Sequence, residues 1–143
     1  MAVQIRRVQL WRTEIRNKLG VLAATLEPLA QAGADLSGVM EYQVPGRSTR
    51  ATVKILPSTG RRAAQAAGFT LSPAPVILVE GDNRPGLAYN VTVAIAWADI
   101  TVRFLSAQVV GDRYSAILGF RTDAEARRAT WLIRRVAATA TVS

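Results

Sequence analysis

The chain has 143 residues, half of them apolar, which is enough for one average domain or two very small ones with a hydrophobic core. It contains neither cysteine nor histidine, so zinc sites, Ser-His-Asp triads and Cys-His catalysis are excluded. The net charge is +8, carried by arginines that occur singly or in pairs, which is typical of a solvated basic surface.

The first half of the chain shows the order β-α-β-β-α-β. Its expected strands alternate apolar and polar residues, and its expected helices carry one apolar face. In chain order these elements are strand 8–15, helix 20–32, strands 36–44 and 49–56, a short helix ending at 67, and strand 69–72. Pro73 and Pro75 then fix an extended backbone, so we place a module boundary there.

The second half repeats this order. The expected elements are strand 76–80, helix 85–98, strands 100–110 and 114–121, helix 123–137, and a last strand from residues 138–143. Such an order is that of the ferredoxin-like motif, an antiparallel four-stranded sheet covered on one face by two helices. The predicted fold class is therefore α+β, with two tandem ferredoxin-like βαββαβ modules, residues 1–72 and 73–143.

The chain also repeats its sequence at an offset of 66 residues. Residues 14–20 align with residues 80–86, and residues 61–63 align with residues 127–129. In both modules an apolar run ends in a Gly turn that opens directly into a helical pattern. The function of this turn is therefore expected in duplicate.

The turn before the second helical pattern has the chemistry of an anion site. A helix N-terminus presents unpaired N–H groups, and a glycine such as Gly86 lets a carboxylate approach the backbone closely. Pro85 at the first helical position would preset the backbone angle, and Asn83 can both donate and accept hydrogen bonds. The same residues also suit a purely structural role, the start of a helix.

Residues 81–87, followed by an apolar helix and a hairpin, resemble the ACT family of small-molecule regulatory domains. Residues 14–22 and 31–36 of the first module resemble it too, so the two matches cover nearly the entire chain. The resemblance implies two modules whose sheets join side by side, with an amino acid or similar small ligand bound where they meet.

The resemblance also implies two ligand sites, each formed by one turn and the start of a strand in the other module. The first site comprises Asn83, Pro85, Gly86 and Leu87 with Asp35 and Leu36. The second comprises Asn17, Leu19, Gly20 and Val21 with Thr101 and Val102. Because Leu19 stands where the other module has Pro85, the turn of the second site is less rigidly set.

We therefore expect a non-catalytic, cytoplasmic regulatory module that forms a homodimer, binds a small molecule and needs neither cofactor nor metal. The N-terminus lacks the pattern of a secretory signal, and the most apolar segment, residues 86–102, falls short of a membrane span. An RNA-binding module is the alternative, because RNA-recognition domains share this topology and the chain is basic. It is weakened because strand 114–121 offers only Tyr114 and Phe120 for base stacking. An enzyme of the small dimeric α/β-barrel kind would have to rely on reactivity of the substrate or an organic cofactor.

Overall fold

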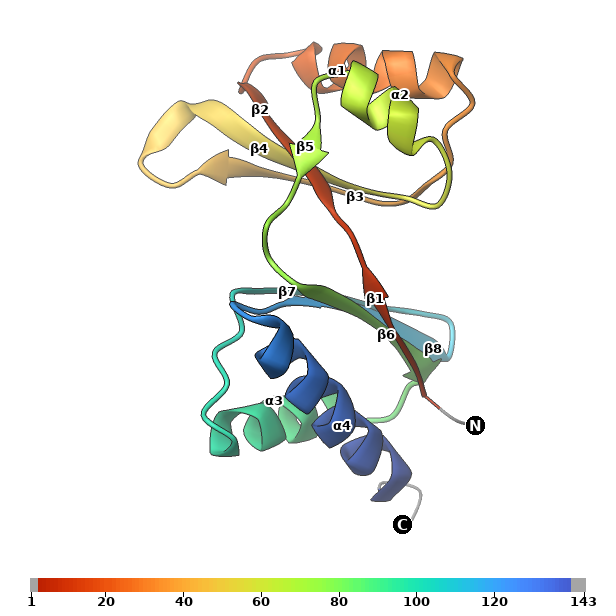
Figure 1. Ribbon diagram of the computed structural model, residues 1–143, viewed down its shortest axis with the longest axis vertical. Coiled ribbons are helices and arrows are strands. Elements are labelled where there is room, and N and C mark those ends of the chain that lie inside the picture. The colour runs from red at the N-terminus through yellow and green to blue at the C-terminus, as the bar shows by residue number, and fades with distance from the viewer. Residues whose placement is uncertain (1–2, 140–143) are drawn as a thin grey trace. The chain divides into compact units, whose positions relative to one another are not determined.

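The computed structural model describes residues 3–139, and Figure 1 labels its helices and strands. The chain divides into two compact units. The middle unit runs from Gln9 to Pro73, and the terminal unit combines the segment up to Val8 with the chain from Ala74 onward. The middle unit contains β2 (Trp11–Arg16), α1 (Val21–Gln31), β3 (Leu36–Val44), β4 (Arg47–Pro57), α2 (Arg61–Ala66) and β5 (Thr70–Leu71). The terminal unit contains β1 (Gln4–Val8), β6 (Val76–Asp82), α3 (Leu87–Trp97), β7 (Phe104–Val110), β8 (Arg113–Gly119) and α4 (Asp123–Thr139).

The middle unit is a complete ferredoxin-like module. Its sheet has the strand order β3-β4-β2-β5, and all three pairings are antiparallel. The apolar residues that alternate along β4 face the helices, as the sequence pattern predicts. The buried core consists of Ile15, Leu29, Ala51, Val53, Ile55, Ala64 and Phe69.

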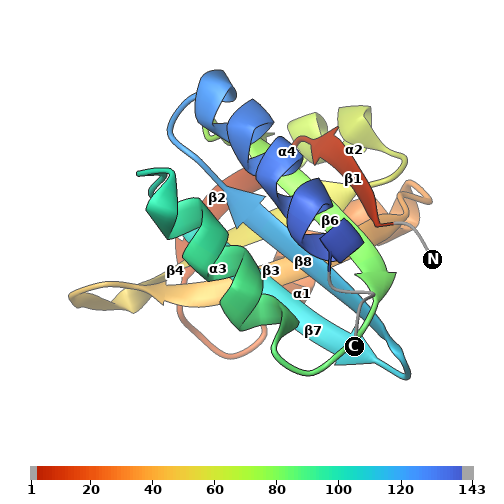
Figure 2. The ribbon, with the colours of Figure 1, turned by 90° about the horizontal axis from the view of Figure 1, so that it is seen from below.

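The terminal unit has the same architecture, but its fourth strand comes from the other end of the chain. Its antiparallel sheet has the order β1-β6-β8-β7, and α3 and α4 cover one face of it (Figure 2). Strand β1 pairs along β6 from Gln4 opposite Glu80 to Val8 opposite Val76. The core of this unit consists of Ile77, Val79, Ile95, Ile100, Leu118, Phe120, Ala126, Ala129 and Ile133.

The predicted fold class is confirmed, because both units are α+β modules of the ferredoxin-like kind. The predicted origin of the last strand is wrong for Ala138, which lies in α4. Residues 140–143 lie outside the described residues. No glycine or proline interrupts the chain after residue 123, so nothing in the sequence ends α4 where a strand was expected. The position beside β6 belongs to β1 instead.

The assignment of residues 1–72 to one module therefore needs a change at its start. The expected strand 8–15 corresponds to β2, which lies in the middle unit, whereas Gln4–Val8 form a separate strand, β1, that was not predicted and lies in the terminal unit. Arg7 of β1 forms an ion pair with Asp123 of α4, a further contact within the terminal unit. The prediction that the two sheets join side by side stays a prediction. Between residues 3 and 139, no helix combines the length and apolar character that crossing a bilayer requires.

Candidate functional site

The two repeated turns have the same backbone conformation. Gly20 has φ 82° and ψ −10°, and Gly86 has φ 83° and ψ −3°. In each turn, the amide that follows the glycine donates a hydrogen bond to the carbonyl three residues earlier, at 3.2 and 3.3 Å. These are the features of a type II turn, whose third residue needs positive φ and therefore favours glycine.

The structure places Pro85 two residues before the start of the helix, and not at its first position as predicted. Helix α3 begins at Leu87 and Gly86 is its N-cap, so Pro85 is the second residue of the turn and not the first of the helix. A proline φ suits both positions, but the left-handed glycine that follows cannot be helical. The start of α3 has no side-chain cap, so Asn83 does not serve as one.

Each turn is also tied to the hairpin of its own unit. The backbone amide of Asn83 donates to the carbonyl of Asp112 at 2.8 Å, and that of Asn17 donates to the carbonyl of Thr49 at 2.8 Å. The Asn17 side chain donates a further hydrogen bond to the carbonyl of Ser48 at 3.0 Å. The two turns are therefore held in equivalent ways, but the Asn17 amide is already engaged within its unit.

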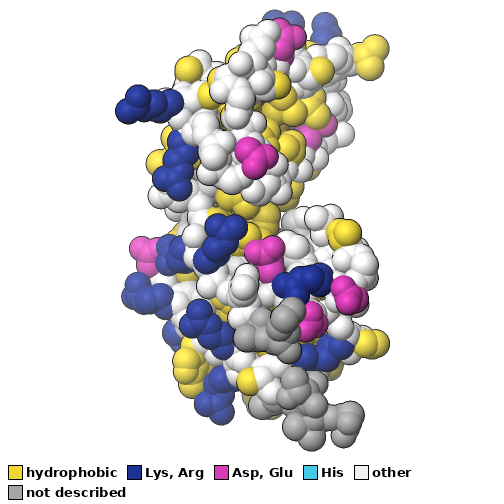
Figure 3. All heavy atoms as spheres, turned by 90° about the vertical axis from the view of Figure 1, so that its right-hand side faces the viewer, with side chains coloured by type: hydrophobic (Ala, Val, Ile, Leu, Met, Phe, Trp, Pro, Cys, Tyr) yellow, Lys and Arg dark blue, Asp and Glu magenta, His cyan; other side chains and the backbone are white. Residues whose placement is uncertain are grey.

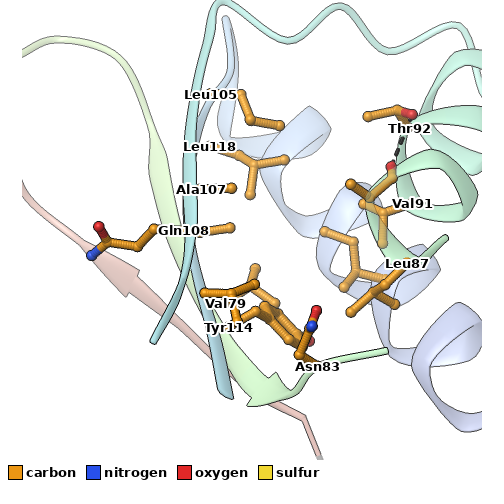
Figure 4. A pocket seen from close by; sticks show the side chains of 14 residues that line it. Val79, Asn83, Leu87, Val91, Thr92, Leu105, Ala107, Gln108, Tyr114 and Leu118 are labelled. Atoms are coloured by element: carbon orange, nitrogen blue, oxygen red, sulfur yellow. Dashed lines mark hydrogen bonds between the residues drawn. The ribbon is translucent and has the colours of Figure 1, made fainter. Parts of the chain in front are cut away.

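A cavity of about 320 Å³ lies next to the turn of the terminal unit, between α3 and the helix-covered face of the sheet. Two residues predicted for the ligand, Asn83 and Leu87, line it (Figure 4). Leu105 and Val109 of the edge strand β7 also line it and are about half exposed, so the cavity reaches solvent along this edge. Its full lining is Val79, Asn83, Leu87, Ala88, Val91, Thr92, Leu105, Ala107, Gln108, Val109, Tyr114, Ala116, Leu118 and Ile133.

Tyr114 brings a hydroxyl group to the end of this cavity where α3 begins (Figure 4). It is paired with Gly81 across β8 and β6, and a Cβ atom at Gly81 would lie only 3.0 Å from the Tyr114 hydroxyl oxygen. The missing side chain at Gly81 therefore lets the Tyr114 ring lie across the strand. Tyr114 is not among the ligand residues predicted from the sequence.

The Tyr114 hydroxyl should lose its proton at a higher pH than an ordinary tyrosine does. Burial raises its pKa above the ordinary value of 10.0, although the nearby charges of Arg84 and Arg113 act in the opposite direction. Below that ordinary value both folded and unfolded states keep the proton, so the contribution of Tyr114 to stability is complete there and is lost as pH rises through the folded pKa. A spectrophotometric difference titration between the wild type and Tyr114→Phe should show a midpoint above 10.0. A midpoint at or below this value would contradict the burial of the phenol.

In the turn before α1 of the middle unit, Leu19 and Val21 have different surroundings. Leu19 is wholly exposed. Val21 starts α1 and packs against the core of the middle unit. No element of the middle unit covers Leu19. Leu19 holds the turn position that Pro85 holds in the terminal unit, and its backbone is less restricted than that of proline.

The residues predicted to complete each site from the other module lie at the start of β3 or before β3 and β7. Asp35 is exposed and its carboxylate accepts a hydrogen bond from the Ser58 hydroxyl at 3.1 Å, while Leu36 begins β3 and packs on the middle core. Thr101 and Val102 lie in the segment that precedes β7, although a strand was predicted from residue 100. Each predicted site combines residues of both units, and that combination stays a prediction.

The two aromatic residues that the RNA hypothesis would need lie on the helix-covered side of the sheet. Tyr114 lines the cavity under α3, and Phe120 is completely buried. On the face shown in Figure 3, basic side chains lie among acidic ones, and Arg113 is paired with Asp82 at 3.0 Å. Neither aromatic residue therefore offers an open stacking platform for a base. Within residues 3–139, no group of three or more acidic side chains could hold a metal ion.

No protein-family model matches the chain, and no curated protein matches it in sequence. Solved structures do match it over nearly its full length. A protein from Bacteroides thetaiotaomicron has a TM-score of 0.75 at 13% identity, covering 92% of this chain and 89% of that one. The ligand-free regulatory subunit of aspartate kinase from Thermus thermophilus has a TM-score of 0.68 at 16% identity, covering 98% and 97%. The corresponding subunit from Thermus flavus has a TM-score of 0.65 at 15% identity, covering 95% and 97%. At such identities the similarity establishes the fold: this chain consists of two tandem ACT-like modules, the fold of aspartate kinase regulatory subunits.

Proposed function

We propose that this protein is a non-catalytic regulatory module that binds an amino acid or a similar small ligand at the turn before α3. One observation carries the proposal: the predicted ligand residues Asn83 and Leu87 line a cavity of about 320 Å³ next to that turn. This volume lies at the lower end of the range of small-molecule sites, about 300–1,000 Å³. The solved structures with this fold include regulatory subunits, which supports a regulatory role.

The polar end of the site suits the main-chain groups of an amino acid. Helix α3 starts without a side-chain cap, so the N–H groups that follow that of Leu87, together with the partial positive charge of the helix start, can receive a carboxylate. The Asn83 side chain can accept from an ammonium group, and the Tyr114 hydroxyl can donate or accept. Binding at such a turn would stabilise the surrounding loop and so couple ligand concentration to the state of the protein.

Isothermal titration against each of the twenty amino acids, after a thermal-shift screen, tests the proposal. We expect at least one of them to bind, and Asn83→Ala to weaken its affinity at least tenfold. The matched control is Asn17→Ala at the equivalent turn of the middle unit, which should retain the affinity. A complete lack of binding at millimolar concentration of every amino acid would overturn the proposal, and loss of affinity in Asn17→Ala alone would move the site to the middle unit.

The proposal includes the homodimer and the cytoplasmic location expected from the sequence. In a homodimeric regulatory module, ligand binding would act through a shift in assembly or in a partner interaction. Sedimentation velocity with and without the amino acid that binds most tightly measures that shift. A monomer under both conditions would remove the dimer from the proposal and leave ligand binding in place.

A further inference from the structure

The polar groups that line the cavity under α3 are gathered at one end. The Thr92 hydroxyl donates to the Ala88 carbonyl at 2.9 Å, and Gln108 directs its amide away from the cavity (Figure 4). Asn83 and Tyr114 are therefore the polar side chains that face the space, both where α3 begins. Apart from Thr92 and Gln108, the rest of the lining is aliphatic. A polar group of a ligand placed deep in this cavity would lose its hydrogen bonds to water without replacement.

The space exists because two small side chains lie side by side on the sheet. Ala107 and Ala116 are directly paired across β7 and β8 on the face that α3 covers. The middle unit has Glu41 and Val53 at the positions that correspond by sheet register, and Val53 is completely buried. Val53 therefore fills the sheet surface of the middle unit at the position where Ala116 leaves a hollow in the terminal unit, whereas Glu41 on the edge strand is exposed.

The next residue pair along the sheet, between β2 and β4 or between β6 and β8, has its large and small residues exchanged between the two units. In the middle unit the large residue is Ile15 on β2 and the small one is Ala51 on β4. In the terminal unit the small residue is Gly81 on β6 and the large one is Tyr114 on β8. The reversal keeps the total bulk similar but brings a hydroxyl group to the end of the cavity, where Asn83 lies.

We infer that the cavity under α3 takes the side chain of an apolar amino acid, with the ligand's ammonium and carboxylate groups at Asn83, Tyr114 and the start of α3. The inference rests on the proposed function and deepens it by naming the ligand class. Each ligand carbon that is buried against the aliphatic walls increases the affinity. The polar groups at the start of α3 need hydrogen bonds from the ligand's ammonium and carboxylate groups. Acidic, basic and amide side chains are rejected because the hollow offers them no partners.

A straight-chain series of ligands measures this directly. Alanine, 2-aminobutyrate, norvaline and norleucine differ by one methylene at each step, and each buried methylene should tighten the dissociation constant by about fourfold. Ala116→Leu fills the hollow, so it should weaken norleucine binding at least tenfold and abolish the rise along the series. The same variant should raise the thermal midpoint of the ligand-free protein, because it fills a cavity.

Two further variants keep the experiment decisive. Ala116→Val introduces the residue that the middle unit has at this position, and it should flatten the series to a smaller extent if the leucine variant does not fold. Ala124→Leu adds the same bulk at an exposed position of α4 outside the lining, so it should leave the series unchanged. A bound amino acid whose affinity does not depend on chain length, or survives in Ala116→Leu, overturns the inference and leaves the proposed function intact. Absence of binding by all twenty amino acids as well as the series overturns the proposed function itself.

Discussion

The Ile5→Asn variant should lose about 2–3 kcal/mol of unfolding free energy from the terminal unit and leave the middle unit unaffected. Ile5 lies on β1 opposite Val79 and packs against the core of the terminal unit. The substitution removes apolar area from that core and puts an amide group there without a partner. Chemical denaturation gives the loss, and hydrogen exchange measured by mass spectrometry assigns it to a unit.

Gln4→Asn is the matched control for this variant. It introduces the same residue, with the same low strand propensity, one position earlier on an exposed side chain of the same strand. Its effect should stay within about 0.5 kcal/mol. Faster exchange in β6 of the Ile5 variant, with β2 and β4 unchanged, would agree with the strand order of the structure. Faster exchange in β2 and β4 instead would contradict it, because β1 would then belong to the module that follows it in sequence.

The behaviour of β1 shows where sequence analysis reached its limit. Around its start, Val3 and Ile5 alternate with Gln4 and Arg6, which fits a half-buried strand, and the residues that follow lead directly into β2. Local pattern specifies that a strand forms, but it does not specify which distant strand edge receives it. The edge of β6 is free for β1 because α4 continues past residue 137 in place of the expected last strand.

The repeated turns were predicted well because their conformation is set locally. A type II turn needs glycine at its third position, so Gly20 and Gly86 fix both turns without help from distant residues. The start of α3 was predicted two residues early because proline is compatible with a turn as well as with a first helical turn. Asn83 and Leu87, which were predicted as ligand residues from the sequence, line the cavity next to this turn, and their role in binding stays a prediction.

The floor of the cavity could not be predicted, because it depends on strand register. Residues 48–50 of β4 lie between two consecutive partners of β3, a bulge that the β7–β8 hairpin lacks. The sequence offset between equivalent residues is 66 up to β3 and β7, and it is three residues smaller from β4 to β8. A constant offset of 66 therefore aligns the wrong residues of β4 and β8. Only the register places Ala116 at the position of Val53 and Tyr114 at that of Ala51.

Gly60→Ala should lower the unfolding free energy of the middle unit by about 2–5 kcal/mol. Gly60 has φ 89°, a left-handed conformation that costs an alanine about 1–2 kcal/mol. A Cβ atom there would also lie 2.4 Å from the Cβ and 2.9 Å from the Cα of Ala34. Because the second contact is with backbone, no change of side-chain rotamer relieves it, and the segment that leads to Asp35 must move. Urea denaturation followed by circular dichroism measures the loss.

Gly68→Ala separates the two causes. Gly68 has φ 90°, almost the same as Gly60, but a Cβ atom there would meet nothing within 4 Å. Its substitution should therefore cost only the backbone strain, about 1–2 kcal/mol. The double variant Gly60→Ala with Ala34→Gly provides a second test, since it removes the 2.4 Å contact between the two Cβ atoms and should recover part of the excess. If Gly60→Ala costs no more than Gly68→Ala, the close approach of the α2 start to Ala34 is wrong. The position of Asp35, which accepts hydrogen bonds from the backbone amides of residues 58 and 59 just before Gly60, would then be wrong with it.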